Sequence, residues 1–384
     1  MVAQPMKLFL IAGEPSGDRL GAALMAGLKS LAPEVEFAGI GGPLMQEQGL
    51  KSLFPMDELS VMGIAEVLPK YRALKRRIAQ SAAAALAYGP AAMITIDSPD
   101  FCLRVAKIVK SAQPGLRTIH YVAPSVWAWR PGRAAKMARV IDHVMALLPF
   151  EPPYMTAAGM TCDFVGHPVV AEPVATQAEA EAFRTMHKIA RDVPLILVLP
   201  GSRKGEITRL APRFGEVAAQ VIAKHPTARI LIQSVQSQQA LVRDLTKNWP
   251  GDPVYLTAPS PMERAAAFTA ANVALAASGT VSLELAAQSC PMVIAYDLNR
   301  VTYWLMRRMM LVDTVTLVNL VTETRIVPEF LGERCRADLI TPAVLHLLEN
   351  GSDQLAAMRQ TMLLLGHGAK PPGLRAAMSV MSAL

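Results

Sequence analysis

The chain has 384 residues, with 38 Lys or Arg against 31 Asp or Glu, so its formal net charge is +7. Apolar residues make up 52% of it and charged residues 18%. This length predicts two domains, each with a core of its own. The basic balance favours an anionic partner, which can be a nucleic acid, an anionic lipid or a phosphorylated ligand, without choosing among them.

The cysteines and the apolar runs argue against four other features. The four cysteines lie far apart, without a CxxC pair or a Cys/His cluster, which is typical of reduced thiols in a cytosolic protein. We therefore expect neither a disulfide framework nor a zinc site. No run of about 18 apolar residues occurs, so no membrane-spanning helix is expected. The run Leu8 to Ala12 is too short for the core of a signal peptide.

A strand, a glycine turn and a helix are predicted at the start of the chain. The apolar run Leu8 to Ala12 is followed by the turn Gly13 to Asp18 and by a helical pattern from Leu20 to Leu31. Further short apolar runs alternate with helical stretches, at Met93 to Ile96, Thr118 to Val122 and Val144 to Leu148. This alternation predicts a parallel sheet in an α/β domain.

The same plan begins again in the second half. The pattern weakens at Gly166-His167-Pro168 and restarts with an apolar run from Leu195 to Pro200 and the turn Gly201 to Glu206. Later strands are predicted at Arg229 to Gln233, Val273 to Ala276 and Pro291 to Ala295. We therefore predict two doubly wound domains, residues 1–168 and 169–365.

The turn Gly201-Ser202-Arg203 is the first candidate ligand site. Free backbone N–H groups and the dipole of the following helix suit a phosphate, and Arg203 adds a planar fork for two contacts. An ordinary turn with a surface arginine explains the same residues equally well. The GxxxxGK[ST] pattern is absent, so this is not a Walker loop.

A second glycine turn is centred on Gly279. Its small residues let the backbone approach an anion, and Ser278, Thr280 and Ser282 offer hydroxyls. A carboxylate beside a phosphate repels it, so we expect Glu284 to bind a neutral group such as the two hydroxyls of a ribose. The alternative is a helix start with a dipole-stabilised glutamate. Two glycine turns in the same half favour a ligand site.

Two carboxylates follow the strand that is predicted to end at Ile96. Either Asp97 or Asp100 can serve as a general base. Asp100 also stands just before a predicted helix, where capping is the simpler role. The residues alone leave both assignments open.

The loop that contains Trp127 and Trp129 is bounded by prolines. Packing beneath the loop is the simpler interpretation, and a platform for a sugar or an acyl chain is the alternative. His120 and His167, near this loop and near the predicted domain boundary, are the only histidines that we single out.

Two segments, Val61 to Arg77 and Tyr303 to Leu311, mix apolar side chains with Lys and Arg. Pro69 is expected to break the first of them. A basic amphipathic segment can lie on an anionic membrane surface. A half-buried helix with solvated cations is the simpler explanation for either alone. Both together, in a chain with few charges, favour membrane contact.

Several catalytic motifs are absent. The chain has no DxD pair, no HExxH and no GxSxG, and Gly39-Ile40-Gly41-Gly42 lacks the third glycine of a dinucleotide fingerprint. We therefore expect no metal ion and no cofactor.

Eight segments, in order, resemble the characteristic segments of the lipid-A-disaccharide synthases. They are Gly13–Asp18, Gly39–Pro43, Ser98–Phe101, Pro124–Trp129, Leu148–Glu151, Pro200–Arg203, Ala277–Thr280 and Leu317–Leu320. The likeness extends from residue 7 to residue 335, and the Ser-Val-Trp-Ala-Trp loop is among its most specific parts.

This resemblance implies an inverting glycosyltransferase of the GT-B fold, with a cleft between two Rossmann-like domains. It implies transfer of 2,3-diacylglucosamine from UDP-2,3-diacylglucosamine to 2,3-diacylglucosamine 1-phosphate, giving the β(1→6) disaccharide of lipid A and UDP. The protein is then expected in the cytoplasm, peripherally on the inner membrane of a Gram-negative bacterium. GT-B chains often end with a helix that returns to the first domain, which is expected here for residues 366–384.

Matched position by position, the resemblance implies Asp100 as the base and Arg203 at the diphosphate. The other matched positions are expected around the substrates: Ser16, Asp18, Gly201, Ser202, Ser278, Gly279, Thr280, Ser282, Glu284 and Asn319. One departure is the absence of the family's glutamine near Gly332, so a donor contact from that side chain does not carry over.

Two rival functions fit parts of the sequence. A UDP-sugar 2-epimerase shares the fold and the ribose-binding glutamate, but its soluble substrates require no basic apolar surface. A nucleic-acid-binding protein would explain the net charge. Aromatic residues are only 5% of the chain, however, and no DNA- or RNA-binding motif occurs. We therefore expect no nucleic acid as a partner.

Overall fold

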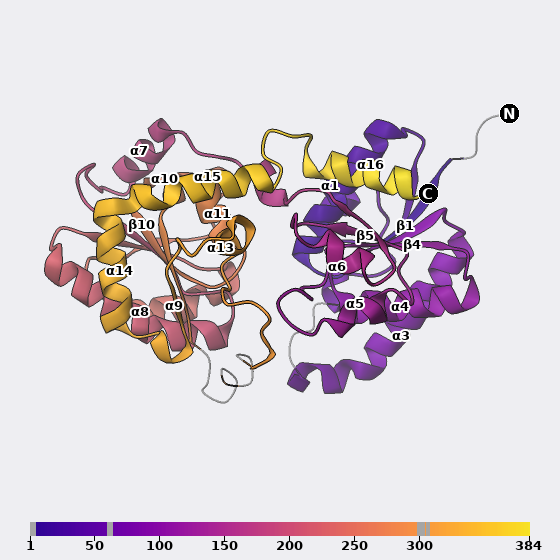
Figure 1. Ribbon diagram of the computed structural model, residues 1–384, viewed down its shortest axis with the longest axis horizontal. Helices are drawn as coiled ribbons and strands as arrows, with labels where there is room; N and C mark the ends of the chain where they lie inside the picture. Colours follow the sequence, from indigo (N-terminus) through magenta and orange to yellow (C-terminus); the bar gives the residue numbers. More distant parts are fainter. Residues whose placement is uncertain (1–4, 60–63, 298–303, 305–307) are drawn as a thin grey trace. The chain divides into compact units, whose positions relative to one another are not determined.

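The computed structural model describes residues 5–59, 64–297, 304 and 308–384. The chain divides into two compact units (Figure 1). Unit 1 comprises Met1–Val170 and Gly368–Leu384, and unit 2 comprises Ala171–His367. Among the described residues, no helix is both long and apolar enough to cross a membrane.

Unit 1 contains a six-stranded parallel sheet in the order β2-β1-β3-β4-β5-β6. Its strands are β1 (Lys7–Ala12), β2 (Glu36–Ile40), β3 (Ala92–Ile96), β4 (Arg117–Tyr121), β5 (His143–Ala146) and β6 (Thr161–Phe164). Its α-helices are α1 (Pro15–Leu31), α2 (Pro43–Glu47), α3 (Ile64–Tyr88), α4 (Pro99–Ala112), α5 (Gly132–Met137), α6 (Pro152–Thr156) and α16 (Pro372–Ala383).

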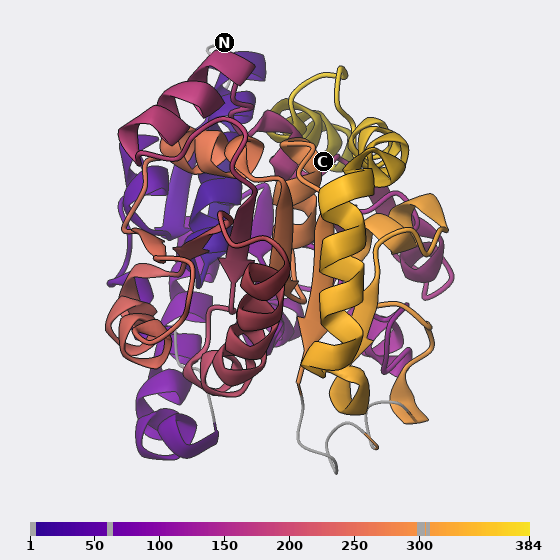
Figure 2. The same ribbon diagram turned by 90° about the vertical axis from the view of Figure 1, so that its left-hand side faces the viewer.

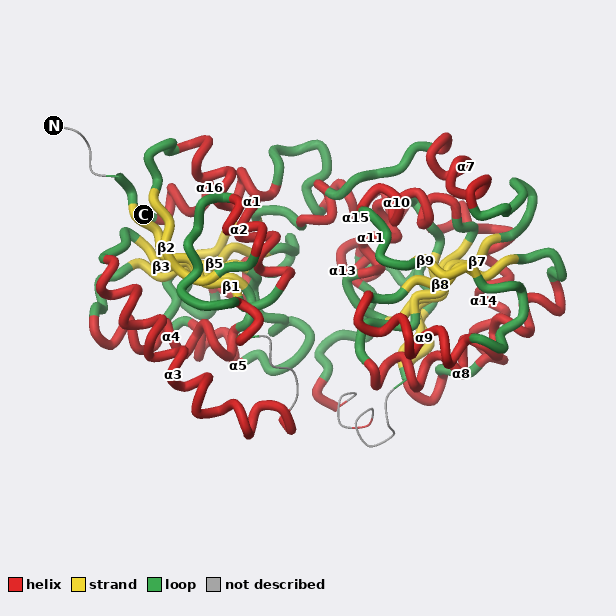
Figure 3. The backbone as a smooth tube through the Cα atoms, turned by 180° about the vertical axis from the view of Figure 1, so that it is seen from behind, coloured by secondary structure: helices red, strands yellow, loops and turns green. Residues whose placement is uncertain are grey.

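Both faces of this sheet are buried. Along β1, Phe9 and Ile11 belong to the apolar cluster on one face, while Leu8 and Leu10 belong to the cluster on the other. Helices cover both faces, as Figure 3 shows. A strand buried on both sides has no polar face, which explains why β1 is a continuous apolar run in the sequence.

Unit 2 repeats this architecture with the strand order β12-β11-β10-β7-β8-β9. Its strands are β7 (Leu195–Leu199), β8 (Arg229–Gln233), β9 (Val254–Leu256), β10 (Val273–Ala277), β11 (Met292–Tyr296) and β12 (Glu329–Leu331). Its α-helices include α7 (Gln177–Met186), α8 (Lys204–Lys224), α9 (Gln239–Thr246), α10 (Pro261–Ala270), α11 (Val281–Ala287), α13 (Leu317–Thr322), α14 (Ala337–Asn350) and α15 (Leu355–Leu364). Figure 2 shows α14 running along the strands that it covers. The predicted pair of Rossmann-like α/β units is confirmed.

Each sheet has one point where the order of the strands reverses. In unit 1 the chain passes from β1 to β2 on one side and then to β3 on the other, so the reversal lies between β1 and β3. In unit 2 it lies between β7 and β10. Ligands of open α/β sheets bind beyond the carboxyl ends of the strands at such points. Both glycine turns of unit 2, and the turns at Gly13 and Asp97 in unit 1, stand at these positions.

The C-terminal helix α16 packs against α1 within unit 1 (Figure 1). The two helices approach closely at glycines, because a Cβ on Gly373 would lie 2.6 Å from the Ala23 carbonyl oxygen and one on Gly27 would lie 2.7 Å from the Gly373 carbonyl oxygen. The hydroxyl of Ser379 adds hydrogen bonds of 2.8 Å to Asp163 and to His143. The chain end is therefore part of the core of unit 1.

This contact predicts the effect of a single methyl group. Gly373→Ala should destabilise unit 1 by about 1–3 kcal/mol, because the added Cβ meets backbone and the helices must separate. Calorimetry should show a Tm lower by several degrees. Gly115→Ala is the matched control, since nothing lies within 4 Å of its added Cβ. A variant of Gly373 as stable as the control would contradict the close packing of α16.

Candidate active site

The two glycine turns of unit 2 follow adjacent strands. Gly201 follows β7 and Gly279 follows β10, and these strands pair in parallel at the point of reversal. Gly201 has φ +106°, which favours glycine, and an added Cβ would lie 2.8 Å from the Glu206 carboxylate. Around the Cβ position of Gly279, nothing lies within 4 Å. The backbone of the second turn is therefore open to a ligand.

A carboxylate of the chain itself occupies the first turn. Glu206 Oε2 accepts hydrogen bonds from the backbone N–H groups of Ser202 and Arg203, at 3.2 and 3.3 Å. Its Oε1 accepts from Arg203 Nη1 at 2.9 Å and from the Tyr296 hydroxyl at 3.0 Å. The turn that we expected to offer free N–H groups thus holds an anion already. An incoming phosphate has to replace Glu206 or bind to the exposed remainder of Arg203.

The hydroxyls of the second turn differ in what they can contact. Thr280 is exposed and Ser278 is half-buried. Ser282 is buried, and its hydroxyl donates to the Gly279 carbonyl oxygen at 3.0 Å. This contact indicates that Ser282 shapes the turn, so we do not retain it as a ligand-binding side chain. The predicted contacts of Ser278, Gly279 and Thr280 stay proposals.

Glu284 lies on α11 and forms an ion pair with Arg264 of α10. Both side chains keep about a third of their surface exposed, at 32% and 36%. The carboxylate is therefore oriented by a cation and still accessible. That arrangement suits an acceptor of hydrogen bonds from neutral hydroxyls, which is the role expected for Glu284.

Asn319 does not present a free group to a ligand. It is buried, its Nδ2 donates to the Val327 carbonyl oxygen at 3.0 Å, and its Oδ1 accepts from Val327 N at 3.0 Å. Nδ2 also contacts Thr314 Oγ1 at 3.3 Å. These bonds tie α13 to the segment before β12. These contacts give Asn319 a positioning role, and its expected contact with UDP stays a prediction.

In unit 1, the turn after β3 brings Asp97 next to the turn after β1. The Ser16 hydroxyl donates to Asp97 Oδ2 at 3.3 Å, and Ser98 N donates to Asp97 Oδ1 at 2.9 Å. Asp97 and Ser98 both have positive φ, at +53° and +43°. Such conformations are unfavourable for side-chain-bearing residues and gather at functional sites. Asp97 is thus held in place by its neighbours.

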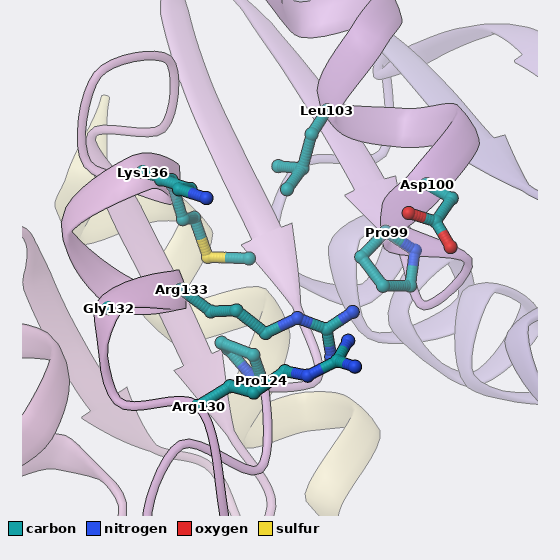
Figure 4. Close-up of a pocket in the computed structure, with 9 residues that line it drawn as sticks. Pro99, Asp100, Leu103, Pro124, Arg130, Gly132, Arg133 and Lys136 are labelled. Carbon is teal, nitrogen blue, oxygen red and sulfur yellow. The ribbon is translucent and has the colours of Figure 1, made fainter.

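Asp100 is exposed in the first turn of α4 and lines a cavity (Figure 4). The N-cap position of α4 belongs to Ser98, and the Asp100 side chain has no hydrogen bond to any described residue. The capping role considered for Asp100 therefore finds no support. Of the two carboxylates, Asp100 is the one free to meet a substrate.

Asp18, expected near a substrate, lies on α1 and is buried with its side chain against the start of α2. Oδ1 accepts from Gly42 N at 2.8 Å and from Met45 N at 3.0 Å, while Oδ2 accepts from Leu44 N at 3.0 Å. These N–H groups are the ones that a helix leaves unpaired at its start. The contacts give Asp18 a structural role, and we do not retain it as a ligand.

The two tryptophans of this loop make different kinds of contact. Trp127 packs edge-on against Phe150 with ring centroids 5.2 Å apart, and its Nε1 donates to Glu151 Oε1 at 3.2 Å. Burial raises the pKa of Glu151 to about 7, against the lowering effect of its N–H donors. Trp129 instead stacks with two arginines. The packing interpretation thus holds for Trp127.

The two histidines singled out in the sequence are buried and uncharged at neutral pH. Burial lowers the pKa of His120 and of His167 to about 4. His120 Nδ1 lies 2.7 Å from the Thr95 hydroxyl, and His167 Nδ1 accepts from Val169 N at 3.2 Å. These contacts are structural.

Comparison with known proteins decides the family. The model of the lipid-A-disaccharide synthetases matches residues 8–369. The lipid-A-disaccharide synthase of Ruegeria pomeroyi is 57% identical over 385 aligned residues, which cover 99% of this chain and 96% of that protein. The enzyme of Rhodospirillum centenum is 45% identical, covering 99% and 95%.

The chain belongs to the lipid-A-disaccharide synthase family. The resemblance seen in the eight segments is thereby confirmed, and the protein is a UDP-sugar glycosyltransferase.

Solved structures support the GT-B fold of this synthase-family protein. UDP-GlcNAc 2-epimerase from Neisseria meningitidis, bound to UDP-GlcNAc, aligns with a TM-score of 0.67 at 11% identity, covering 98% of this chain and 99% of that one. MurG of Acinetobacter baumannii aligns with a TM-score of 0.54 at 13% identity, covering 99% and 100%. Likeness at this level concerns the fold alone, so the sequence relatives, and not these structures, separate the synthases from the epimerases.

The two basic amphipathic segments are described only in part. Residues 60–63, 298–303 and 305–307 lie outside the described structure, as do the side chains of residues 64–71. Arg77 forms a two-pronged ion pair with Glu58, at 2.8 and 2.7 Å, so its charge is compensated. In the second segment Arg308 stacks 4.0 Å from the ring centroid of the exposed Trp304.

The sequence analysis assigned no role to the side chains of Glu206, Glu151 and Arg264. Glu206 stands in the first turn of α8, directly after the candidate turn, and its spacing from Arg203 is that of an i,i+3 pair on a helix. This spacing is visible in the sequence and could have indicated the ion pair between Arg203 and Glu206. No comparable signal exists for Arg264, which meets Glu284 only through the packing of α10 near α11.

Proposed function

We propose that the protein transfers 2,3-diacylglucosamine from UDP-2,3-diacylglucosamine to the 6-hydroxyl of 2,3-diacylglucosamine 1-phosphate, with inversion. The products are the β(1→6) lipid A disaccharide 1-phosphate and UDP. The full-length relationship to the lipid-A-disaccharide synthases carries the proposal. The exposed polar groups at the reversal points of both sheets support it.

Unit 2 is proposed to hold the donor. The uridine diphosphate lies at the Gly201 and Gly279 turns, with Arg203, Ser202 and Thr280 on the phosphates. Glu206 gives up its two backbone N–H groups to a diphosphate oxygen when the donor binds. Glu284, oriented by Arg264, accepts hydrogen bonds from the ribose hydroxyls. Charge that develops on the departing diphosphate is then met by fixed donors and by one guanidinium.

Unit 1 is proposed to hold the acceptor and the base. Asp100 accepts the proton of the acceptor 6-hydroxyl while the oxygen attacks C1 of the donor. The new O6–C1 bond forms on the face opposite the diphosphate, and the C1–O bond to UDP breaks with both electrons leaving on UDP. Ser16 and Asp97, hydrogen-bonded to one another, lie at the same end of the sheet and orient the turn.

A peripheral position on the inner face of the cytoplasmic membrane is part of this proposal. Both substrates carry acyl chains, and the segment Val61 to Arg77 combines apolar with basic side chains. Arg72, Lys75 and Arg76 are exposed on α3. Cations of this kind are attracted by anionic lipids.

The direct experiment is a product assay with UDP-2,3-diacylglucosamine and 2,3-diacylglucosamine 1-phosphate in detergent micelles. Stoichiometric disaccharide 1-phosphate and UDP are expected, with the same turnover in EDTA. Epimerised UDP-sugar without disaccharide would contradict the proposal. Loss of turnover in EDTA, restored by Mg²⁺, would contradict its metal-free form.

Arg203→Ala should lower kcat by about 10²- to 10³-fold, the usual loss for one group that stabilises developing charge. Steady-state kinetics with saturating donor measure it. Arg191→Ala is a matched control, because Arg191 is an exposed arginine of the same unit, paired with Glu181. Turnover of Arg203→Ala close to that of the control would remove Arg203 from the site.

Asp100→Asn should fold normally and bind UDP normally, yet lose about 10²- to 10⁴-fold in turnover, because an amide cannot accept the proton. Asp97→Asn should lose less, since Asp97 is held by Ser16 and Ser98 within its own turn. Kinetics and UDP titration of both variants test whether Asp100→Asn loses more turnover than Asp97→Asn. The assignment of the base is wrong if Asp97→Asn is the more damaging change.

Replacing Lys70, Arg72, Lys75 and Arg76 together by Gln should release the protein from phosphatidylglycerol vesicles in a flotation assay. Each cation near an anionic surface contributes about 1 kcal/mol, and salt weakens the effect. Arg77 is left in place because Glu58 already compensates its charge. Undiminished vesicle binding would mean that this part of α3 is an ordinary solvated surface.

A further inference from the structure

A cavity of about 470 Å³ lies in unit 1 between the start of α4 and the segment that leads into α5. Figure 4 shows its two sides. Pro99, Asp100 and Leu103 come from α4, and Arg130, Arg133 and Lys136 come from the loop and from α5. The cavity thus combines one carboxylate with three cations.

These three cations are not paired with an acidic side chain in the described part of the chain. None of Arg130, Arg133 and Lys136 forms a salt bridge or a side-chain hydrogen bond with a described residue. Elsewhere in the unit, Lys110 meets Asp142 at 2.6 Å and Arg77 meets Glu58 at 2.7 Å. Cations that stand together without partners repel one another and attract an anion.

The two guanidinium groups are held in place before any ligand binds. Arg130 Cζ lies 4.1 Å and Arg133 Cζ 5.5 Å from the ring centroid of Trp129. Their side chains run next to one another in Figure 4. Arg130 has φ +52°, a conformation that few arginines adopt. Two planar forks side by side match the several oxygens of a phosphate better than a single carboxylate.

We propose that this cavity binds the phosphomonoester of the acceptor substrate. The inference rests on the proposed function, which supplies an acceptor with a 1-phosphate and a reacting 6-hydroxyl. In a hexopyranose, C1 and the carbon that carries C6 both flank the ring oxygen. One sugar therefore directs its phosphate to Arg130, Arg133 and Lys136 and its hydroxyl to Asp100.

The charges balance in this arrangement. Three cations and one carboxylate give the cavity a formal charge of 3 − 1 = +2. A phosphomonoester carries about −1.5 to −2 at neutral pH.

The phosphate group of a bilayer lipid is the alternative ligand for the same cations. A second cavity of about 520 Å³ shares Pro99, Asp100, Leu103 and Lys136 with the first. It continues over Arg104, Lys107 and Lys110 of α4 and over Arg139, which follows α5. Of these two cavities, Arg130 and Arg133 line the first and not the second. Their fixed geometry next to Asp100 favours the acceptor over a laterally mobile headgroup.

The test compares two acceptors in detergent micelles, namely 2,3-diacylglucosamine with and without its 1-phosphate. The double variant Arg130→Gln, Arg133→Gln should raise the KM for the phosphorylated acceptor about 10- to 100-fold, the loss expected for a charge-assisted hydrogen bond. The KM for the donor and the rate with the phosphate-free acceptor should not change. Arg359→Gln, an exposed arginine of α15, is the matched control.

Two further variants extend the test should the first one fail to fold. They are Lys136→Gln and the double variant Arg130→Lys, Arg133→Lys. Both should weaken the preference for the phosphorylated acceptor, the first by loss of charge and the second by loss of the forks. A preference equal to that of the wild type in these variants would overturn the inference. So would normal acceptor preference in micelles together with lost binding to phosphatidylglycerol vesicles, since the cations would then serve the bilayer.

Failure of the proposed function gives a different result. Wild-type protein that forms no disaccharide from the phosphorylated acceptor contradicts the function itself. Wild-type protein that forms disaccharide, with variants that keep its acceptor preference, contradicts only the phosphate site.

Discussion

The reversal of strand order in each parallel sheet is the constraint on which the rest of this structure depends. At that point neighbouring strands send their connections in opposite directions, so their carboxyl ends are left uncovered by helices. In unit 2 this places the Gly201 and Gly279 turns next to one another, and in unit 1 it places Ser16 within hydrogen-bonding reach of Asp97. The same backbone rule thus builds a candidate substrate site in each unit.

The candidate sites are also distinguished by how their charged side chains are paired. Several charged side chains elsewhere in the described structure pair with an opposite charge, as Lys110 does with Asp142. At one candidate site the cations form no ion pair with a described residue, and at the other Glu206 pairs with Arg203 of the same turn. Glu206 occupies the turn where the diphosphate is proposed to bind, and the cations beside Asp100 form no salt bridge with a described residue. An anion that replaces Glu206, or that joins Arg130 and Arg133, meets donors that are already in position.

The sequence predicted the architecture because its signals are local. Apolar runs, glycine turns and helical periodicity identify β1, β7 and β10 and the turns after them, and the parallel plan follows from their alternation. The short strands β2, β6, β9 and β12 were not predicted, because a run of three to five residues with partial burial shows little hydrophobic pattern. The family was recognised from motifs whose residues are close in sequence.

The roles of individual side chains depended on contacts between distant segments, and here the sequence was a weaker guide. Asp18 and Asn319 are polar residues in characteristic motifs, and each proves to satisfy backbone groups of another segment. Arg133 belongs to no motif in the sequence, and only the fold places it against Trp129 and in the cavity that Asp100 lines. A motif thus marks a residue as important without distinguishing a ligand contact from a structural one.

The central claim is that the donor nucleotide binds at the reversal point of unit 2. Hydrogen–deuterium exchange of the wild-type protein, with and without UDP, tests it most directly. The account predicts slower exchange at the turns of residues 200–206 and 277–284, with the turns of unit 1 at residues 13–18 and 97–100 unchanged. Protection confined to unit 1, or absent from both turns of unit 2 at saturating UDP, would contradict it.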